Sequence, residues 1–169
     1  MRTEKGGAMR VRGTGGFSLL EVMVVIVVFG IMAMIAMPKW EGVLARIRTR
    51  GAAARVAADI AYTRQIAART GQRARLEIEP SADCPPPQFG AAGHRYRIII
   101  AGRDSVAALV DLRMDAGRVC LTSNQSSRIV FTSNGLTAGF NNRTLSLRQG
   151  NYRPTLLTVS AVGRVRRRD

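Results

Sequence analysis

The first strong pattern along the chain is an apolar run of 21 residues from Phe17 to Met37, in which Glu21 is the only charged residue. A helix rises about 1.5 Å per residue, so such a run spans about 31 Å, close to the hydrocarbon thickness of a bilayer. We therefore predict a membrane-spanning helix over residues 17–38. We expect Pro38 to kink the helix where the run ends.

A second pattern follows Pro38 and has the spacing of an amphipathic helix. Apolar residues recur three or four positions apart, or at multiples of these spacings, at Trp40, Val43, Leu44, Ile47, Val56, Ile60 and Ile66. This spacing predicts that the helix continues over residues 39–71, reaches about Thr70 and has Gly71 as its C-terminal cap. We expect its apolar face to pack on the domain that follows.

From Gln72 onward, apolar and charged residues alternate, which is typical of a half-buried strand over residues 72–79. Consecutive prolines predict a loop over Ser81–Gly93. Further strands are predicted at Arg95–Ala101, Ala107–Met114, Arg118–Thr122, Arg128–Thr132, Thr144–Arg148 and Thr155–Val162. A long helix followed by strands predicts an α+β fold in which residues 72–169 form an antiparallel β-rich domain.

The 16 residues before the apolar run carry four basic residues and one acidic residue. A positive flank keeps the N-terminus in the cytoplasm and sends the C-terminal part across the membrane. A secretory signal peptide has a shorter apolar core with small residues after it, whereas here Gly15 and Gly16 precede the core. An ordinary signal peptide therefore fits poorly.

Glu21 is costly inside a membrane helix, by about 2.5–3.5 kcal/mol at the helix centre and less near its end. Two interpretations stay open. The carboxylate reaches the membrane surface, or it pairs with a positive group on a neighbouring protein. One such group is the free amine that cleavage after Gly16 would create.

The formal net charge of the chain is +15, and all but two of its 26 basic residues are arginine. Such a charge indicates a polyanion partner, nucleic acid or an anionic lipid surface, although a GC-rich genome also enriches arginine. Loss of residues 1–16 would still leave +12, so the positive charge lies mainly on the exported part.

Two cysteines and one histidine are the remaining candidates for special chemistry. Cys84 and Cys120 form no CxxC motif, and with His94 as the only histidine they do not predict a zinc site or any other metal site. Outside the cytoplasm a Cys84–Cys120 disulfide is expected, and we expect His94 to be a surface or loop residue. The sequence contains no nucleophile triad, phosphate loop or paired carboxylates, so we predict neither an enzyme nor a cofactor.

Gly16, Phe17 and Glu21, followed by the apolar run and Pro38, resemble the type IV prepilin signature. The resemblance implies that a prepilin peptidase removes residues 1–16 as a leader, cleaving between Gly16 and Phe17, and that Phe17 is N-methylated. It also implies that Glu21 helps to dock the subunit into a filament of other pilins. Residues 17–38 would then serve first as the inner-membrane anchor and later in the filament core.

Two C-terminal segments, RIVFTSNGLTAGFNNRTLSL and LLTVSAVGRVR, resemble the GspH/FimT family of minor pilins. The resemblance implies a type IV pilin-like fold, with the long helix packed on an antiparallel sheet in the periplasm. FimT-type members carry a C-terminal Gly-Arg-x-Arg element that binds DNA during natural transformation. Gly163, Arg164, Val165 and Arg166 match this element residue by residue.

Arg167 and Arg168 extend this basic element to the end of the chain. If the last strand continues, Arg164, Arg166 and Arg168 lie on one face, and their planar guanidinium groups suit phosphates. On charge alone, a solvated and frayed terminus is the simpler interpretation. With the resemblance, we expect non-specific binding of extracellular DNA by Gly163, Arg164, Arg166, Arg167 and Arg168.

Three functions stay open from the sequence. The first is a DNA-binding minor pilin of a type IV pilus. The second is structural: a minor pseudopilin of a type II secretion system, or a pilus-priming minor pilin without affinity for DNA. The Gly16–Glu21 signature is common to all of these. The third is a membrane-anchored protein with an uncleaved helix.

Overall fold

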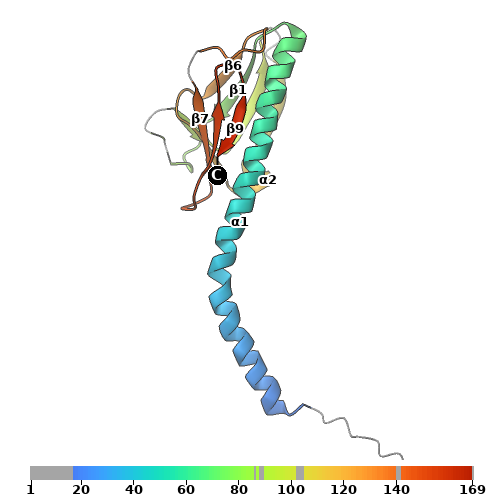
Figure 1. The fold of residues 1–169 in the computed structure, drawn as a ribbon, viewed down its shortest axis with the longest axis vertical. Helices are drawn as coiled ribbons and strands as arrows, with labels where there is room; N and C mark the ends of the chain where they lie inside the picture. Colours follow the sequence, from blue (N-terminus) through green and yellow to red (C-terminus); the bar gives the residue numbers. More distant parts are fainter. Residues whose placement is uncertain (1–16, 86, 88–89, 102–104, 140–141, 169) are drawn as a thin grey trace, which may run out of the picture. The chain divides into compact units, whose positions relative to one another are not determined.

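The structure, a computed structural model, describes residues 17–85, 87, 90–101, 105–139 and 142–168, except for the side chains of residues 36–39 and 115 (Figure 1). The expected leader, including Gly16, lies outside the described residues. The chain divides into two units, Met1–Trp40 and Glu41–Asp169.

One long helix, α1, occupies Leu19–Thr70. Its first turn is capped by Ser18, whose Oγ accepts a hydrogen bond of 3.2 Å from the backbone N–H of Glu21. It ends before Gly71, which has the left-handed φ of 65° that closes many helices, as the pattern predicted. Pro38, the predicted kink, lies among the residues whose side chains are not described.

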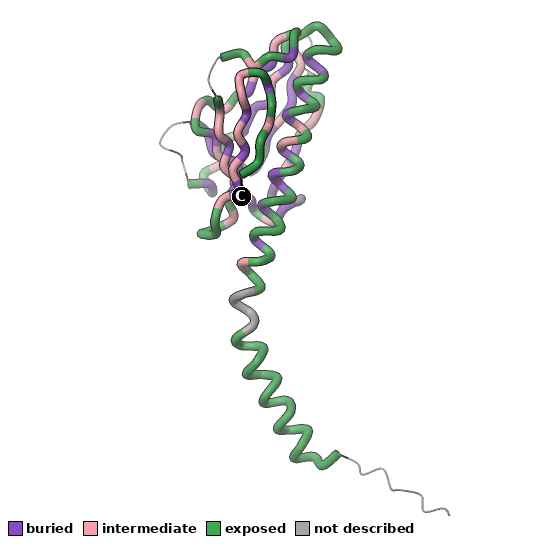
Figure 2. Tube along the Cα trace, in the orientation of Figure 1, coloured by how far each residue is buried: buried purple, intermediate pink, exposed green. Residues whose placement is uncertain are grey.

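In the first unit, the described side chains of α1 from Leu19 to Ile35 are all exposed (Figure 2). Within the described ranges, no unbroken helix is long and apolar enough to cross a membrane. The segments Leu19–Ile35 and Trp40–Thr70 of α1 have the length and hydropathy of a membrane span only when they are taken together.

The second unit contains two antiparallel sheets, with strand orders β4-β3-β1-β6 and β2-β5-β7-β8-β9. The strands are β1 (Ala74–Glu79), β2 (Ala91–Gly93), β3 (Arg95–Ile100), β4 (Ser105–Asp111), β5 (Cys120–Ser123), β6 (Arg128–Phe131), β7 (Arg143–Arg148), β8 (Thr155–Val159) and β9 (Val165–Arg168). A short helix, α2 (Leu112–Ala116), follows β4. The predicted α+β fold, a long helix against antiparallel strands, is confirmed.

One face of α1 packs against both sheets in the second unit. Its buried positions recur every three or four residues, at Ala45, Thr49, Ala52, Ala53, Val56, Ile60, Thr63, Ile66 and Ala67. Side chains from β1, β3, β6, β7 and β8 share one core with this face. The fully buried Tyr96 also donates a 2.6 Å hydrogen bond to Asp59, which ties β3 to α1.

The expected packing of the first apolar residues of this helix is wrong. Val43, Leu44 and Ile47 are 52%, 45% and 61% exposed. The small residues Ala45 and Thr49 face the core instead, because the helical period that brings Ala52 and Val56 onto the sheets also turns these two inward.

Three strand predictions also need correction. The strand predicted over Thr155–Val162 stops at Val159, and after a turn a separate strand, β9, begins at Val165. Ala91–Gly93 lies inside the predicted loop but forms β2, paired with β5. A β-carbon at Gly93 would overlap the carbonyl oxygen of Glu79, so only glycine fits this close approach. The strand predicted to reach Met114 stops at Asp111, which caps α2 by accepting a 2.8 Å hydrogen bond from the backbone N–H of Arg113.

Candidate functional site

Arg166, Arg167 and Arg168 lie on an ordered strand, β9, which forms an edge of the second sheet, and Arg164 precedes this strand by one residue. The hairpin that joins β8 to β9 has the three-residue loop Ala161-Val162-Gly163. Its backbone hydrogen bonds run from Gly163 N–H to Ser160 O (2.8 Å) and from Ser160 N–H to Arg164 O (2.9 Å). Gly163 has a φ of 76°, the left-handed position that ends such a loop. The frayed terminus considered from the charge pattern is therefore not what this part of the chain forms.

Gly163 is buried, and the side chains of Arg64 and Phe131 pack closely against it. A β-carbon there would lie 3.1 Å from Cδ of Arg64 and 3.2 Å from Cε1 of Phe131. The turn is also tied to the loop after β6, because Ala161 O accepts a 3.1 Å hydrogen bond from the backbone N–H of Thr137. Gly163 thus fixes where β9 starts and has little surface of its own to offer a ligand.

The strand register separates the four arginines into two sets. Val165 is half-buried and packs against the core, so Arg167 lies on the same side of β9. Arg164, Arg166 and Arg168 alternate with them on the outward face and are exposed. Alternate residues of a strand are about 6.6 Å apart, which is the spacing of Arg166 and Arg168 along β9, and Arg164 extends the row at the turn.

The outward face of the neighbouring strands is polar and carries no carboxylate in the described part of β7, β8 and β9. Thr144 and Thr158 lie in register with Arg166, and Ser146 and Leu156 lie in register with Arg168. Alternation along β7 places one more arginine, Arg148, on this face. The alternation of Leu145 and Leu147 is the sequence signal for Arg148, which is not among the predicted site residues.

Arginines on the other sheet are paired with carboxylates. Glu77 accepts a 2.7 Å hydrogen bond from Arg128 Nε, and the Nε atoms of Arg97 and Arg75 lie 3.5 and 3.7 Å from its other oxygen. Burial alone would raise the pKa of Glu77, but the Arg128 hydrogen bond and the three positive charges outweigh burial and lower that pKa from its usual 4.5. This face is electrically compensated, unlike the face of β9.

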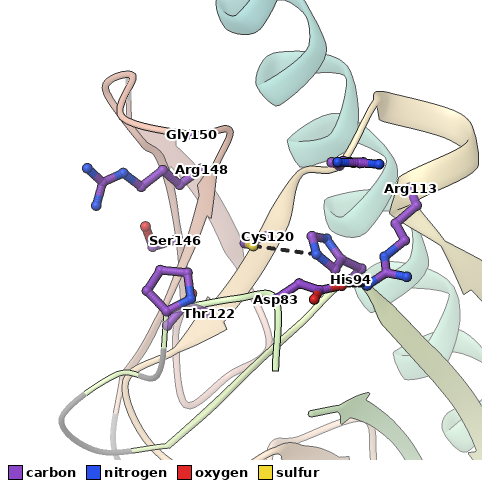
Figure 3. A pocket seen from close by; sticks show the side chains of 10 residues that line it. Asp83, His94, Arg113, Cys120, Thr122, Ser146, Arg148 and Gly150 are labelled. Atoms are coloured by element: carbon purple, nitrogen blue, oxygen red, sulfur yellow. Dashed lines mark hydrogen bonds and ion pairs between the residues drawn. The ribbon is translucent and has the colours of Figure 1, made fainter. Parts of the chain in front are cut away.

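A cavity of about 970 Å³ lies beside the second sheet (Figure 3). Arg148 and Ser146 lie on one side of this cavity, and Asp83 and Arg113 form an ion pair on the other. Between them, Cys120 is joined by a disulfide to Cys84, with the two Cα atoms 5.7 Å apart.

His94 was expected at the surface or in a loop, and that expectation is wrong. It is only 4% exposed, directly follows β2 and lies against the disulfide, with Nε2 3.4 Å from Sγ of Cys84. Its Nδ1 lies 3.0 Å from the carbonyl oxygen of Val119.

Near the N-terminus, Phe17 is 81% exposed, and Glu21 is exposed in the first turn of α1. The contact between Ser18 Oγ and the Glu21 N–H belongs to an N-terminal capping motif, Ser-x-x-Glu. The motif is visible in the sequence as Ser18 and Glu21, three residues apart at the start of the apolar run. Glu21 is therefore part of the N-terminal cap of α1, in addition to the role expected for it in a filament.

Comparisons with known proteins agree with this architecture. Residues 52–163 match the family described as type II transport protein GspH, and residues 11–37 match the prokaryotic N-terminal methylation motif. No curated protein sequence matches the chain significantly.

Two crystal structures of the type IV minor pilin FimU from Pseudomonas aeruginosa (strain PAO1) have a similar fold. Both are 20% identical to the chain, with TM-scores of 0.55 and 0.52. They cover 73% and 71% of this chain and 90% and 92% of their own. At this identity the likeness shows the fold alone. The match over residues 52–163 shows that the chain belongs to the GspH family of pilins and pseudopilins, structural and non-enzymatic subunits that are anchored in the inner membrane by a methylation-motif helix before they assemble with other pilins.

Proposed function

We propose that this chain is a FimT-like minor pilin of a type IV pilus that binds extracellular DNA without sequence preference, for uptake in natural transformation. The observation that supports this most directly is the outward row formed by Arg166 and Arg168 on an ordered edge strand and by Arg164 at the turn that leads into it. Arg167 adds charge from the other side of the strand. Gly163 has a positioning role, because it sets the turn that leads into the row.

The chemistry of the row suits a phosphate backbone. Each guanidinium can donate two hydrogen bonds to one phosphate, and the strand and the turn before it hold the three groups in one row. Thr144, Thr158 and Ser146 can add neutral hydrogen bonds beside the row, and Arg148 extends the positive charge across the sheet. No aromatic residue lies within β7, β8 or β9, so the proposal rests on backbone contacts and not on base stacking.

Processing and assembly are part of the same proposal. A prepilin peptidase cleaves between Gly16 and Phe17 and methylates Phe17, inside the segment that matches the methylation motif. Glu21 then aids assembly of the released helix into the filament. N-terminal sequencing of the mature protein should begin at methylated Phe17, whereas an intact Met1 would contradict the cleavage and favour an uncleaved anchor.

A structural pseudopilin of a type II secretion system is the second candidate. The matched family carries the description of a type II transport protein, and the exposed Val43, Leu44 and Ile47 on α1 suit contacts between subunits in either filament. Neither this candidate nor a pilus-priming minor pilin requires affinity for DNA. DNA binding therefore separates these structural roles from the first proposal.

The test measures binding of the full chain, in detergent micelles, to labelled duplex DNA over a series of salt concentrations. Arg164→Ala with Arg166→Ala should weaken binding to unrelated DNA sequences alike. It should also flatten the plot of log affinity against log salt by about 1.8 units, roughly 0.9 for each lost phosphate contact.

The matched control is Arg69→Ala with Arg73→Ala. It removes the same charge from two exposed arginines, Arg69 in the last turn of α1 and Arg73 directly before β1, a strand of the other sheet. If both double variants bind alike, binding depends on net charge and not on the β9 row. If the wild-type chain does not bind DNA at moderate salt, the structural candidate holds.

A further inference from the structure

The imidazole of His94 is aimed at the disulfide. Its Nε2 lies 3.4 Å from Sγ of Cys84 and 3.8 Å from Sγ of Cys120, and the side chain is almost completely buried. Figure 3 draws the contact between His94 and Cys120 as a dashed line. These two sulfurs are weak partners for a buried ring nitrogen, since neither sulfur of a disulfide carries a proton to donate.

The other ring nitrogen fixes which atom carries the proton. Nδ1 lies 3.0 Å from the carbonyl oxygen of Val119, and a carbonyl can only accept a hydrogen bond. In the neutral imidazole Nδ1–H is therefore the donor, and Nε2 presents its lone pair to the two sulfurs. A histidine whose second N–H is held by a backbone carbonyl is the usual arrangement around a protein-bound metal.

We propose that Cys84, Cys120 and His94 form a redox-gated site for a thiophilic divalent cation, Zn²⁺ in the first instance. Ligand atoms of one tetrahedral zinc ion, with bonds of about 2.3 Å to sulfur and about 2.05 Å to nitrogen, lie about 3.6 Å apart across the S···N edge. The observed distances of 3.4 and 3.8 Å bracket that value. Only the two sulfurs must separate, to about 3.8 Å, after the S–S bond breaks.

Metal binding first requires reduction of the disulfide by a dithiol oxidoreductase. Two electrons and two protons pass from the donor dithiol to Cys84 and Cys120, which become thiols while the donor becomes a disulfide. Zn²⁺ then binds the two sulfurs as thiolates together with His94 Nε2, and the two thiol protons go to solvent. In the oxidised state the sulfurs are poor ligands, because the thiolate is the form that binds metals.

The cavity of about 970 Å³ supplies an entry path and a fourth coordination position. His94 and Cys120 line it, together with Asp83, the residue next to Cys84 in the chain. The Asp83 side chain is 68% exposed and ion-paired with Arg113, so it can stay where it is while water completes the tetrahedron. The sequence predicts no metal site here, because two distant cysteines without a CxxC motif and a single histidine show no ligand spacing. The fold brings their ligand atoms within 4.8 Å of one another.

The test uses the full chain in detergent micelles, before and after reduction with a phosphine. Titration with Zn²⁺ against a chromophoric chelator should give one bound ion per reduced chain and much weaker binding by the oxidised chain. Co²⁺ added to the reduced chain should give thiolate-to-metal charge-transfer bands and the ligand-field bands of a tetrahedral ion. Zn²⁺ should also raise the urea midpoint of the reduced chain.

Three variants complete the test. His94→Ala should lower the Zn²⁺ affinity of the reduced chain by more than about 100-fold, because loss of an outer-shell partner alone costs 10–100-fold. Cys84→Ser with Cys120→Ser should abolish binding. Ser146→Ala, which changes the cavity lining without removing a ligand, should bind as the wild type does.

Equal Zn²⁺ affinity in His94→Ala and wild type would overturn the proposal. So would equal affinity in the oxidised and reduced chains. If His94→Ala does not fold, the wild-type Co²⁺ spectrum decides, because absence of thiolate-to-cobalt bands from the reduced chain also overturns it.

Discussion

The side chain of Arg64 fills the space that a β-carbon at Gly163 would need, with its Cδ 3.1 Å from that position. Arg64 Nε also donates a 3.0 Å hydrogen bond to the carbonyl oxygen of Gly135. One arginine of α1 therefore supports two left-handed glycine turns, and the second of these leads directly into the arginine row of β9. The position of the row depends on the helix through this contact.

Gly163→Ala should lower the free energy of unfolding by about 2–5 kcal/mol. The left-handed φ costs an alanine about 1–2 kcal/mol, and the contacts with Arg64 and Phe131 add about 1–3 kcal/mol of overpacking. Gly150→Ala is the matched control, because Gly150 has a φ of 53° but open space around it. Urea unfolding measures both variants, and equal losses would show that the packing at Gly163 is unimportant.

Arg148→Ala should reduce the salt dependence of DNA binding by about 0.9 units, the effect of one phosphate contact. Arg148 lies on the same outward face as the arginine row, and the described part of β7, β8 and β9 carries no carboxylate on that face to neutralise its charge. Arg97→Ala removes the same charge from the other sheet, where Arg97 lies 3.5 Å from Glu77, and should leave the slope unchanged. A fluorescence titration over a salt series measures both slopes. The reverse order of effects would move the DNA face to the other sheet.

Much of this fold is readable from the alternation of side chains. The strands at Ala74–Glu79 and Arg128–Phe131 begin within two residues of their predicted starts, because buried apolar residues occur there at every second position. The strand at Ala91–Gly93 has no such signal. Its small residues pair with a strand some thirty positions later and fit beneath Glu79 only because Gly93 lacks a side chain.

Some features of the candidate site could likewise be predicted from the sequence, and others could not. The alternation along a strand predicted that Arg164, Arg166 and Arg168 share one face if the last strand continues. The face agrees, but the strand does not continue: a turn after Val159 reverses the chain, and a new strand begins at Val165. The support from Arg64 could not be read, because it depends on how a turn packs on a helix about a hundred residues earlier. Likewise, the position of His94 depends on the pairing of two sheet segments and not on local spacing.

Glu77→Gln should lower the free energy of unfolding at neutral pH by about 1–3 kcal/mol, because Arg128, Arg97 and Arg75 lose their common carboxylate. The folded-state pKa of Glu77 is lowered. Its stabilising effect is therefore complete above the unfolded-state pKa near 4.5 and is lost as the pH falls through the folded-state value.

The stability difference between wild type and Glu77→Gln should accordingly be constant near neutral pH and shrink below about pH 4.5. Urea unfolding at a series of pH values measures it. Glu41→Gln serves as the control, because it removes an exposed carboxylate whose 3.5 Å hydrogen bond from Tyr152 Oη a glutamine oxygen can still accept. A difference that stays constant down to about pH 3 would contradict the ion-pair explanation.

Ile47→Asp should leave the folded chain stable and yet keep it out of filaments. Ile47 is 61% exposed and lies one turn from Val43 and Leu44, which are 52% and 45% exposed, so these side chains stabilise little within the subunit. A carboxylate buried there against a neighbouring pilin would lose its hydration without a partner. Ala45→Asp, at a position 3% exposed, should instead destabilise the subunit itself. Urea unfolding and the amount of each variant in sheared filaments separate the two effects. Normal incorporation of Ile47→Asp would mean that this face of α1 stays in water after assembly.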